Sequence, residues 1–318
     1  MNILITGACG YQGTKLIPIL LSKKHKITAI DTQWFGNKLK KHKNLKNIKK
    51  NILDIKDKDL KGIEIVIHLA SIANDPMGDL DKNLTWEVSC IGTMKLMEFA
   101  VKNKVRKFIY ASSASVYGIK KEKKVIETLS LKPISTYNKA KMIAEKTILS
   151  YSNKIDVTII RPATVCGVSP RMRFDVSVNM MSYQALKNGT MTVFGGKQTR
   201  PNIHIDDLLD LYQFFFKKNK KFNGIFNAGF ENLKIIEIAK KAKENIPSEI
   251  KVFKNNIDIR DYRLDSSKLL ALGFKPKKTV EDAIKEIKIY YGKNIDKVDK
   301  SCFSIKWLSG KYKKNLNK

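Results

Sequence analysis

Tyr137 and Lys141 stand four residues apart in the segment STYNKAK, a spacing that puts both side chains on one face of a helix. A phenol is a poor base near neutral pH, but a neighbouring ammonium and a cationic nicotinamide ring would stabilise its phenolate form. Ser113, in the segment YASSASVYG, is placed to hydrogen-bond a substrate hydroxyl and hold it against Tyr137. These residue types suit proton removal from a secondary alcohol while hydride leaves the same carbon.

A tyrosine with a lysine four residues later also occurs on ordinary solvated helix faces, so the pair needs independent support. That support is the segment GACGYQG, in which Gly7, Gly10 and Gly13 follow an apolar run and precede a helical pattern. Glycines with this spacing allow a tight turn that brings the backbone close to a pyrophosphate. Asp31 ends the next apolar run, where a carboxylate accepts ribose hydroxyls and repels a 2′-phosphate. The sequence therefore predicts NAD rather than NADP. Asp54, in NILDI after a third short strand, is either an acceptor for the adenine edge or an ordinary loop aspartate.

Alternating short apolar runs and helical patterns must position these residues. We expect strands at 2–6, 26–30, 63–69, 106–111 and 155–160, and helices at 14–24, near 80–104 and at 136–152. This alternation predicts an α/β fold, a Rossmann-type doubly wound parallel sheet. Beyond residue 165 the rhythm is irregular, with helices expected at 174–187, 206–219, 233–245 and 279–291.

The expected division is a cofactor-binding domain over 1–165, to which elements from about 200–245 return, and a smaller, partly discontinuous lobe over 166–199 and 246–292. That lobe would bind the substrate. Residues 293–318 form a lysine-rich tail to which the sequence assigns no role.

Composition narrows the possible partners. The net charge of the 318 residues is +31, but only seven of the 61 basic residues are arginine and no nucleic-acid-binding motif is present. We therefore expect a diffuse basic surface and no specific nucleic-acid partner. The four cysteines lack metal-ligand spacing, and no segment is apolar for long enough to span a membrane. These features predict a cytoplasmic protein with reduced thiols and no bound metal.

Six segments in order, GACGYQG, HLAS at 68–71, YASSASVYG, YNKAK, RPATVCG and RPNIHIDDL, resemble the extended short-chain dehydrogenase/reductase family. Within it, the chain is most similar to the NAD-dependent nucleotide-sugar epimerases and dehydratases, such as UDP-glucose 4-epimerase, over residues 1 to about 291. The resemblance implies catalytic roles for Ser113, Tyr137 and Lys141, and a nucleotide-diphosphate sugar as substrate. It also implies NAD contacts from Gly7, Gly10, Tyr11, Gln12, Gly13, Asp31, Asp54, Ile55, Leu69, Ala70, Ser71, Tyr137 and Lys141.

Two departures from the family pattern are informative. The family's 4,6-dehydratases carry an Asp-Glu pair directly after the catalytic Ser or Thr, whereas this chain has Ala114 and Ser115. Without that acid and base, epimerisation or simple oxidation and reduction is favoured over water elimination. Ser89 replaces a usual asparagine, which would alter a contact with a neighbouring strand.

Five of the seven arginines fall in the second lobe: Arg171, Arg173, Arg200, Arg260 and Arg263. The resemblance implies substrate binding by Ser113, Asn179, Arg200 and Arg260. Arg171, Arg173 and Arg263 are left open between anion binding and salt bridges. We expect His204 to pack at an interface with Asp206 or Asp207.

The sequence thus favours an NAD-dependent epimerase that inverts one carbon of a nucleotide sugar through a transient ketone. The resemblance further implies a homodimer formed by a helix pair, and a place in cell-surface polysaccharide biosynthesis. A dehydrogenase, reductase or dehydratase of the same substrates is the alternative within the enzyme class. A scaffold that senses a dinucleotide, or a nucleic-acid-binding protein, is the alternative outside it.

Overall fold

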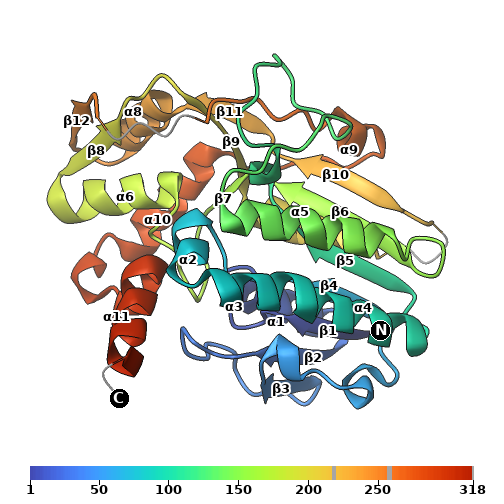
Figure 1. The fold of residues 1–318 in the computed structure, drawn as a ribbon. Helices are drawn as coiled ribbons and strands as arrows, with labels where there is room; N and C mark the ends of the chain where they lie inside the picture. The colour runs from blue at the N-terminus through green and yellow to red at the C-terminus, as the bar shows by residue number, and fades with distance from the viewer. Residues whose placement is uncertain (217–219, 256–259, 317–318) are drawn as a thin grey trace.

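The computed structural model describes residues 1–216, 220–255 and 260–316. Seven parallel strands form the main sheet in the order β10-β6-β5-β4-β1-β2-β3 (Figure 1). They are β1 (Asn2–Thr6), β2 (Lys26–Asp31), β3 (Leu45–Lys49), β4 (Ile65–His68), β5 (Lys107–Ala111), β6 (Asp156–Pro162) and β10 (Gly224–Ala228). The strand order changes direction between β1 and β4. The predicted doubly wound parallel sheet is confirmed.

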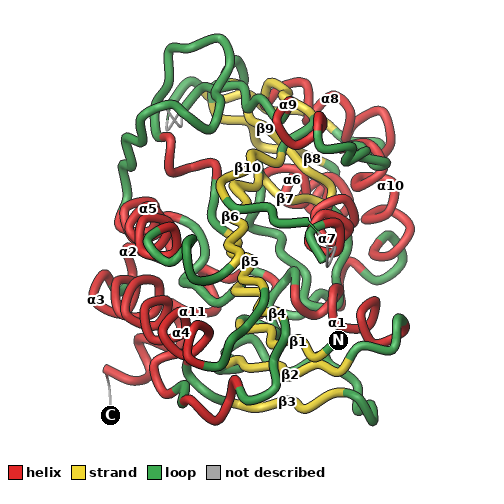
Figure 2. The backbone as a smooth tube through the Cα atoms, turned by 90° about the vertical axis from the view of Figure 1, so that its right-hand side faces the viewer, coloured by secondary structure: helices red, strands yellow, loops and turns green. Residues whose placement is uncertain are grey.

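Helices cover both faces of this sheet (Figure 2). α1 (Gly13–Ser22) and α7 (Ile205–Phe214) lie on one face, and α4 (Gly92–Lys102) and α5 (Thr136–Leu149) lie on the other. Alternate residues of each strand point to opposite faces, so Ile3 packs in the first cluster and Leu4 in the second. Burial on both faces explains why the central strands β1, β4 and β5 are mostly apolar.

The single helix expected near 80–104 is in fact four segments: α2 (Asp75–Leu80), α3 (Lys82–Trp86), a π-helical turn (Glu87–Ile91) and α4. The break occurs at Asp81, whose backbone is extended and whose carboxylate accepts a hydrogen bond from the Leu84 amide at 2.9 Å. Asp81 thereby ends one helix and caps the next. Ser89, in the π-helical turn, is buried, and its hydroxyl lies 3.5 Å from that of Ser71.

The second part of the chain builds a smaller layer around two short sheets. α6 (Ser177–Asn188), α8 (Ile235–Asn245) and α10 (Val280–Tyr291) share a hydrophobic cluster with β8 (Thr190–Phe194), which pairs with β12 (Glu249–Phe253). A three-stranded sheet joins β7 (Thr164–Cys166), β9 (Thr199–His204) and β11 (Glu231–Lys234), and α9 (Ser267–Ala271) follows. The expected helix at 206–219 ends as α7 at Phe214, and residues 217–219 lie outside the described ranges. The proposed division into two lobes stays a prediction, although β10 does return to the main sheet.

The C-terminal segment is an ordered element rather than a featureless tail. After two short 3₁₀ turns, α11 (Ser304–Leu316) packs beside α2. Leu308 is buried in the core, and the indole nitrogen of Trp307 donates to the Trp34 carbonyl at 2.8 Å. α11 therefore rests on the loop that follows β2. Within the described ranges, none of the helices is long and apolar enough to span a bilayer.

Candidate active site

The glycine turn between β1 and α1 lies where the strand order reverses, the usual ligand position in such sheets. Gly7 has a φ of +69°, and a Cβ there would lie 2.6 Å from the Ala70 nitrogen. A Cβ on Gly13 would lie 2.4 Å from the Ala8 carbonyl oxygen. Only glycine permits this close packing of turn, strand and helix, which leaves backbone amides at the start of α1 available for phosphate.

A cleft that is partly open to solvent begins at this turn. Its lining contains most of the predicted cofactor residues: Gly7, Gly10, Tyr11, Gln12, Asp31, Leu69, Ala70 and Ser71. Gly13, Tyr137 and Lys141 lie outside the lining. These residues suit a dinucleotide, because a glycine cradle stands beside a carboxylate at the end of β2.

Asp54 and Ile55 lie outside the lining of the cleft, so their contacts with the cofactor stay a prediction. Asp54 is exposed, and the cleft is lined instead by Asn51, Ile52 and Lys50. β3 ends at Lys49, so the residues that directly follow the strand face the cleft. Asn51 then accepts a hydrogen bond from the Leu53 amide at 3.1 Å and starts a 3₁₀ turn that directs Asp54 to solvent.

Asp31 is held in place by two backbone amides. One carboxylate oxygen accepts from the Cys9 amide at 3.0 Å and the other from the Gln33 amide at 2.6 Å. Burial raises the pKa of Asp31, and these two hydrogen bonds act in the opposite direction. The carboxylate thus stands beside the glycine turn, as expected for an acceptor of ribose hydroxyls.

Ser113, Tyr137 and Lys141 come together where β5 ends against α5. Lys141 is buried, donates to the Ala111 carbonyl at 2.7 Å, and its ammonium lies 5.9 Å from the centre of the Tyr137 ring. Ser113 lies close enough to Tyr137 to lower the pKa of its phenol, against the larger effect of burial. α2 packs directly on the tyrosine, since a Cβ on Gly78 would lie 2.9 Å from the Tyr137 Cβ. The structure thus brings the predicted trio together.

Burial shifts the pKa of both ionisable groups toward their neutral forms. It raises the pKa of Tyr137 to about 12, against the opposing effects of the Ser113 hydroxyl and the Arg173 charge. It lowers the pKa of Lys141 from 10.5 to about 7, with Glu145 opposing the shift. Without ligands, Lys141 therefore changes charge near neutral pH.

This shift predicts a pH-dependent difference in stability between cofactor-free wild type and Lys141→Met. Above pH 7 the folded protein has a neutral Lys141 while the unfolded chain keeps the proton, so wild-type stability rises with pH. The wild-type free energy of unfolding should gain up to about 1.4 kcal/mol per pH unit relative to the variant between pH 7 and 9. Below pH 7 the difference should level off. Urea denaturation across this range measures it.

Lys139→Met, which removes an exposed ammonium from the same helix, is the control. A constant difference between wild type and Lys141→Met from pH 6 to 9 would contradict the prediction.

A chain of hydrogen bonds links Ser113 to the second half of the chain. The Ser113 hydroxyl lies 2.8 Å from that of Ser115, which donates to the Asn138 side-chain oxygen. Asn138 donates to Asp75 at 2.8 Å, and Asp75 also pairs with Arg260 at 2.8 Å. Ser115, at the position where dehydratases carry an acid, therefore connects the candidate catalytic serine to its neighbours.

The arginines divide into different roles. Arg200 donates to the Arg260 carbonyl, so the two predicted substrate ligands are neighbours. Arg260 is also ion-paired with Asp75, which lies near Tyr137.

Arg173 lines the cleft and makes two hydrogen bonds to Asp175, at 2.9 and 3.2 Å. Arg263 is exposed.

The structure does not support Asn179 as a direct substrate ligand. Asn179 is fully buried, accepts from the Gly167 amide at 3.0 Å and donates to the Tyr11 hydroxyl at 3.1 Å. Tyr11 in turn donates to the Gly167 carbonyl at 2.6 Å. Both side chains therefore fix the segment after β7 against the glycine turn, although Tyr11 also lines the cleft.

A buried ion pair between β6 and α5 stabilises the site. Arg161 of β6 makes two hydrogen bonds to Glu145 of α5, at 2.9 and 2.6 Å, and a third to the Tyr117 hydroxyl at 2.7 Å. The Ser112 hydroxyl donates to the same carboxylate. This network ties α5, which carries Tyr137 and Lys141, to the strand end that carries Ser113.

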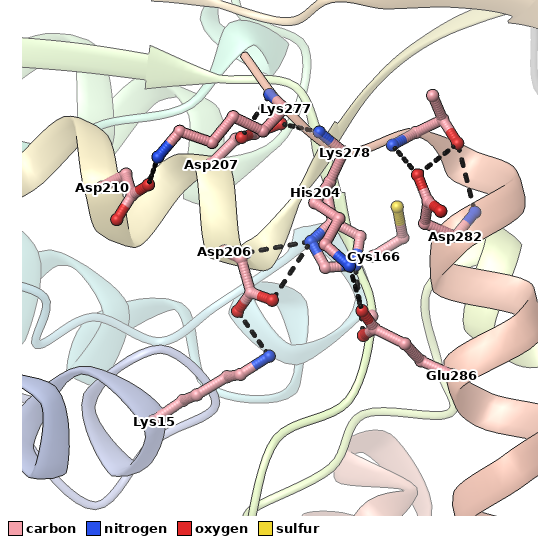
Figure 3. A network of polar contacts seen from close by, with 12 residues as sticks. Lys15, Cys166, His204, Asp206, Asp207, Asp210, Lys277, Lys278, Asp282 and Glu286 are labelled. Atoms are coloured by element: carbon pink, nitrogen blue, oxygen red, sulfur yellow. Dashed lines mark hydrogen bonds and ion pairs between the residues drawn. The ribbon is translucent and has the colours of Figure 1, made fainter. Parts of the chain in front are cut away.

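His204 belongs to a separate polar network (Figure 3). Its Nδ1 accepts from the Asp206 amide at 3.1 Å, and its Nε2 lies 3.2 Å from Glu286. The expected packing beside Asp206 is confirmed. Three potential metal ligands meet here, but Lys15 pairs with Asp206 at 2.5 Å and Lys278 with Glu286 at 3.2 Å. The lysines already balance both carboxylates, so the cluster works as a structural junction.

Several site residues escaped the sequence interpretation. Asp75 and Asn138 carry no recognisable pattern, and only the tertiary structure places them beside Tyr137. Trp34 and Phe35 line the cleft from the loop after β2. Asn51 and Ile52 could have been predicted from the sequence, because they follow the end of the third strand.

Comparisons with known proteins agree with this architecture. A family model described as the NAD dependent epimerase/dehydratase family matches residues 3–229. An uncharacterized UDP-glucose epimerase of Bacillus subtilis is 34% identical over 65% of this chain and 70% of its own length. The UDP-glucose 4-epimerase of Mycolicibacterium smegmatis is 30% identical over 67% of this chain and 72% of its own. The Bacillus cereus UDP-glucuronic acid 4-epimerase structure, containing NAD, is 26% identical, with a TM-score of 0.80, over 92% of this chain and 100% of that one.

Fold and cleft together define an NAD-dependent enzyme of the extended short-chain dehydrogenase/reductase class. The chain belongs to the NAD-dependent epimerase/dehydratase family, whose members among its relatives act on nucleotide sugars.

Proposed function

We propose that this enzyme is an epimerase that inverts a secondary alcohol centre, at carbon 4, of a nucleotide-diphosphate sugar. The observation that carries the proposal is the group formed by the buried Tyr137 and Lys141 and the partly buried Ser113, near the glycine-lined cleft. The names of three relatives or neighbours, two UDP-glucose 4-epimerases and a UDP-glucuronic acid 4-epimerase, support carbon 4 and a UDP-sugar.

In this proposal Tyr137 takes the hydroxyl proton of the sugar and returns it to the inverted product. Ser113 holds the sugar oxygen against the phenol, and a protonated Lys141 stabilises the phenolate through its charge. NAD, held by the glycine turn and Asp31, would supply the hydride acceptor for oxidation of the alcohol carbon and the hydride donor for its re-reduction. Arg200 and Arg260, which are neighbours and of which Arg260 pairs with Asp75, would bind the diphosphate of the same substrate.

The residues after Ser113 argue against dehydration. Ala114 has no ionisable group, and Ser115 is hydrogen-bonded to Asn138, so neither supplies the acid and base that water elimination needs.

The test is product analysis with a panel of UDP-glucose, UDP-glucuronic acid, UDP-N-acetylglucosamine and dTDP-glucose, each with NAD. We expect a C4 epimer, identified by NMR, without stoichiometric NADH. NADH equal to the substrate consumed would instead establish a dehydrogenase, and a 4-keto-6-deoxy product a dehydratase. As part of the same proposal, the enzyme works in the cytoplasm, consistent with its four free thiols, and supplies sugars for cell-surface polysaccharide.

We also propose a homodimer formed through α4 and α5, which lie side by side on one face of the sheet (Figure 1). This face exposes apolar side chains: Ile91 is 48% exposed, Met94 46% and Ile143 37%. Burying them against a second copy would remove apolar surface from water.

Met94→Glu should therefore convert a dimer to a monomer in light scattering after size exclusion, because it places charge on that surface. Ile289→Glu, on the far helix α10 where Ile289 is 83% exposed, should leave the dimer intact. A monomeric wild type, or a dimeric Met94→Glu variant, would contradict the proposed interface.

A further inference from the structure

Arg171 is a buried cation on the wall of the cofactor cleft. It is 5% exposed and lines the same cleft as the glycine turn and Asp31. Its Nη2 donates to the Ser304 hydroxyl of α11 at 2.8 Å. Its Nε has no hydrogen-bond partner in the part of the chain that the structure describes. A buried guanidinium with an unmet donor is unfavourable unless an anion completes its contacts.

The surroundings of Arg171 place it between two parts of the cofactor site. Its backbone amide donates to the Thr14 hydroxyl in the first turn of α1, at 3.3 Å. Its guanidinium lies 3.9 Å from the centre of the Phe35 ring, in the loop that follows Asp31. The side chain therefore extends from the phosphate-binding end of α1 toward the residue expected to hold the ribose.

Arg171 is also the less neutralised of the two arginines in the cleft. Arg173 is paired with Asp175 by two hydrogen bonds, whereas Arg171 has the neutral hydroxyl of Ser304 and only longer-range interactions with Asp175 and Asp31. Burial and the Arg173 charge lower the pKa of Arg171 to about 10, so the side chain still carries its charge at neutral pH.

We propose that Arg171 binds the pyrophosphate of the dinucleotide, and that Ser304 of α11 positions it. The inference rests on the proposed cofactor role of the cleft. It gives the C-terminal segment a function, because the Trp307 contact with Trp34 and the burial of Leu308 hold Ser304 at the cleft wall. The pyrophosphate is then bound by backbone amides of the glycine turn and by a guanidinium from the opposite half of the chain.

The test titrates two ligands, ADP-ribose and adenosine, into the full-length, NAD-free protein and measures binding by calorimetry. ADP-ribose contains the pyrophosphate and adenosine lacks it, so the comparison separates recognition of phosphate from recognition of adenosine. Arg171→Met should weaken ADP-ribose binding by about 10- to 100-fold, the loss of one or two charge-assisted hydrogen bonds. Adenosine affinity should change by less than about twofold. Arg171→Lys, which keeps the charge and loses the fork, should fall between wild type and Arg171→Met.

Arg106→Met is the matched control, since Arg106 also has a buried Nε without a hydrogen-bond partner among described residues but lies outside the cleft lining. Ser304→Ala should weaken ADP-ribose binding by about 3- to 10-fold, whereas Lys306→Ala, an exposed position of the same helix, should not. Circular dichroism checks that each variant folds.

Wild-type ADP-ribose affinity in folded Arg171→Met, or equal losses of adenosine and ADP-ribose affinity, would overturn the inference while leaving the cofactor site in place. Failure of wild type to bind NAD or ADP-ribose would overturn the assignment of the cleft itself. The experiment measures ligand affinity rather than turnover, so neither result depends on the identity of the sugar substrate.

Discussion

Replacing Tyr137 with phenylalanine should lower turnover by about 10²- to 10⁴-fold, because the variant loses the group that takes the hydroxyl proton. NAD should still bind, since the glycine turn and Asp31 are unchanged and Tyr137 lies outside the cleft lining. The expected result is thus a folded protein with wild-type NAD content and almost no epimer formed. Steady-state assays and NAD release on denaturation measure the two quantities separately.

Tyr110→Phe is the matched control for this experiment. Tyr110 is buried, its hydroxyl has no hydrogen-bond partner within the described ranges, and its ring lies under Lys141 at 4.6 Å. The variant keeps that ring and removes only a hydroxyl, so activity should stay close to wild type. Substantial activity in Tyr137→Phe would refute the assigned base, and loss of NAD from it would show that the tyrosine acts mainly in cofactor binding.

The second large effect is on stability. Glu145→Ala should lower the free energy of unfolding by about 3–5 kcal/mol, because it leaves Arg161 buried without its counter-ion. Arg161 is 2% exposed, so solvent cannot replace the carboxylate. The Ser112 hydroxyl loses its acceptor in the same variant. Urea denaturation of wild type and variant at one pH measures the difference.

An exposed pair provides the comparison. Glu281 and Lys285, one helical turn apart on α10, are 2.6 Å apart, and Glu281→Ala should cost no more than about 1 kcal/mol. The double variant Glu145→Met/Arg161→Met removes both buried charges and should recover part of the loss. A Glu145→Ala variant as stable as Glu281→Ala would contradict the assigned role of the buried pair.

The parts of the fold that the sequence predicted are those in which local pattern and burial agree. β1, β4, β5 and β6 are buried over almost their whole length, so each contains a short run of apolar residues between helices. The glycine turn could be predicted because the structure has no room for a side chain at Gly7 and Gly13, so these positions must be glycine and form a recognisable spacing. Tyr137 and Lys141 were recognised from their spacing together with a resemblance to known enzymes.

The parts that escaped prediction depend on contacts between distant segments. Strands β7 to β12 other than β10 are short and only partly apolar, and pairing across long intervals defines them. Asp75 becomes a site residue only through its contacts with Asn138 and Arg260, which lie far from it in the sequence. The resemblance implied that Asn179 binds substrate, yet its side-chain amide accepts one hydrogen bond and donates two inside the protein.

The position of α11 also affects how the enzyme matures during synthesis. The glycine turn and Asp31 leave the ribosome early, but β10 completes the main sheet only after residue 228 has been made. Ser304 and Trp307 come later still, and Ser304 is part of the cleft wall. A nascent chain would therefore display an open, incomplete nucleotide site for most of its translation.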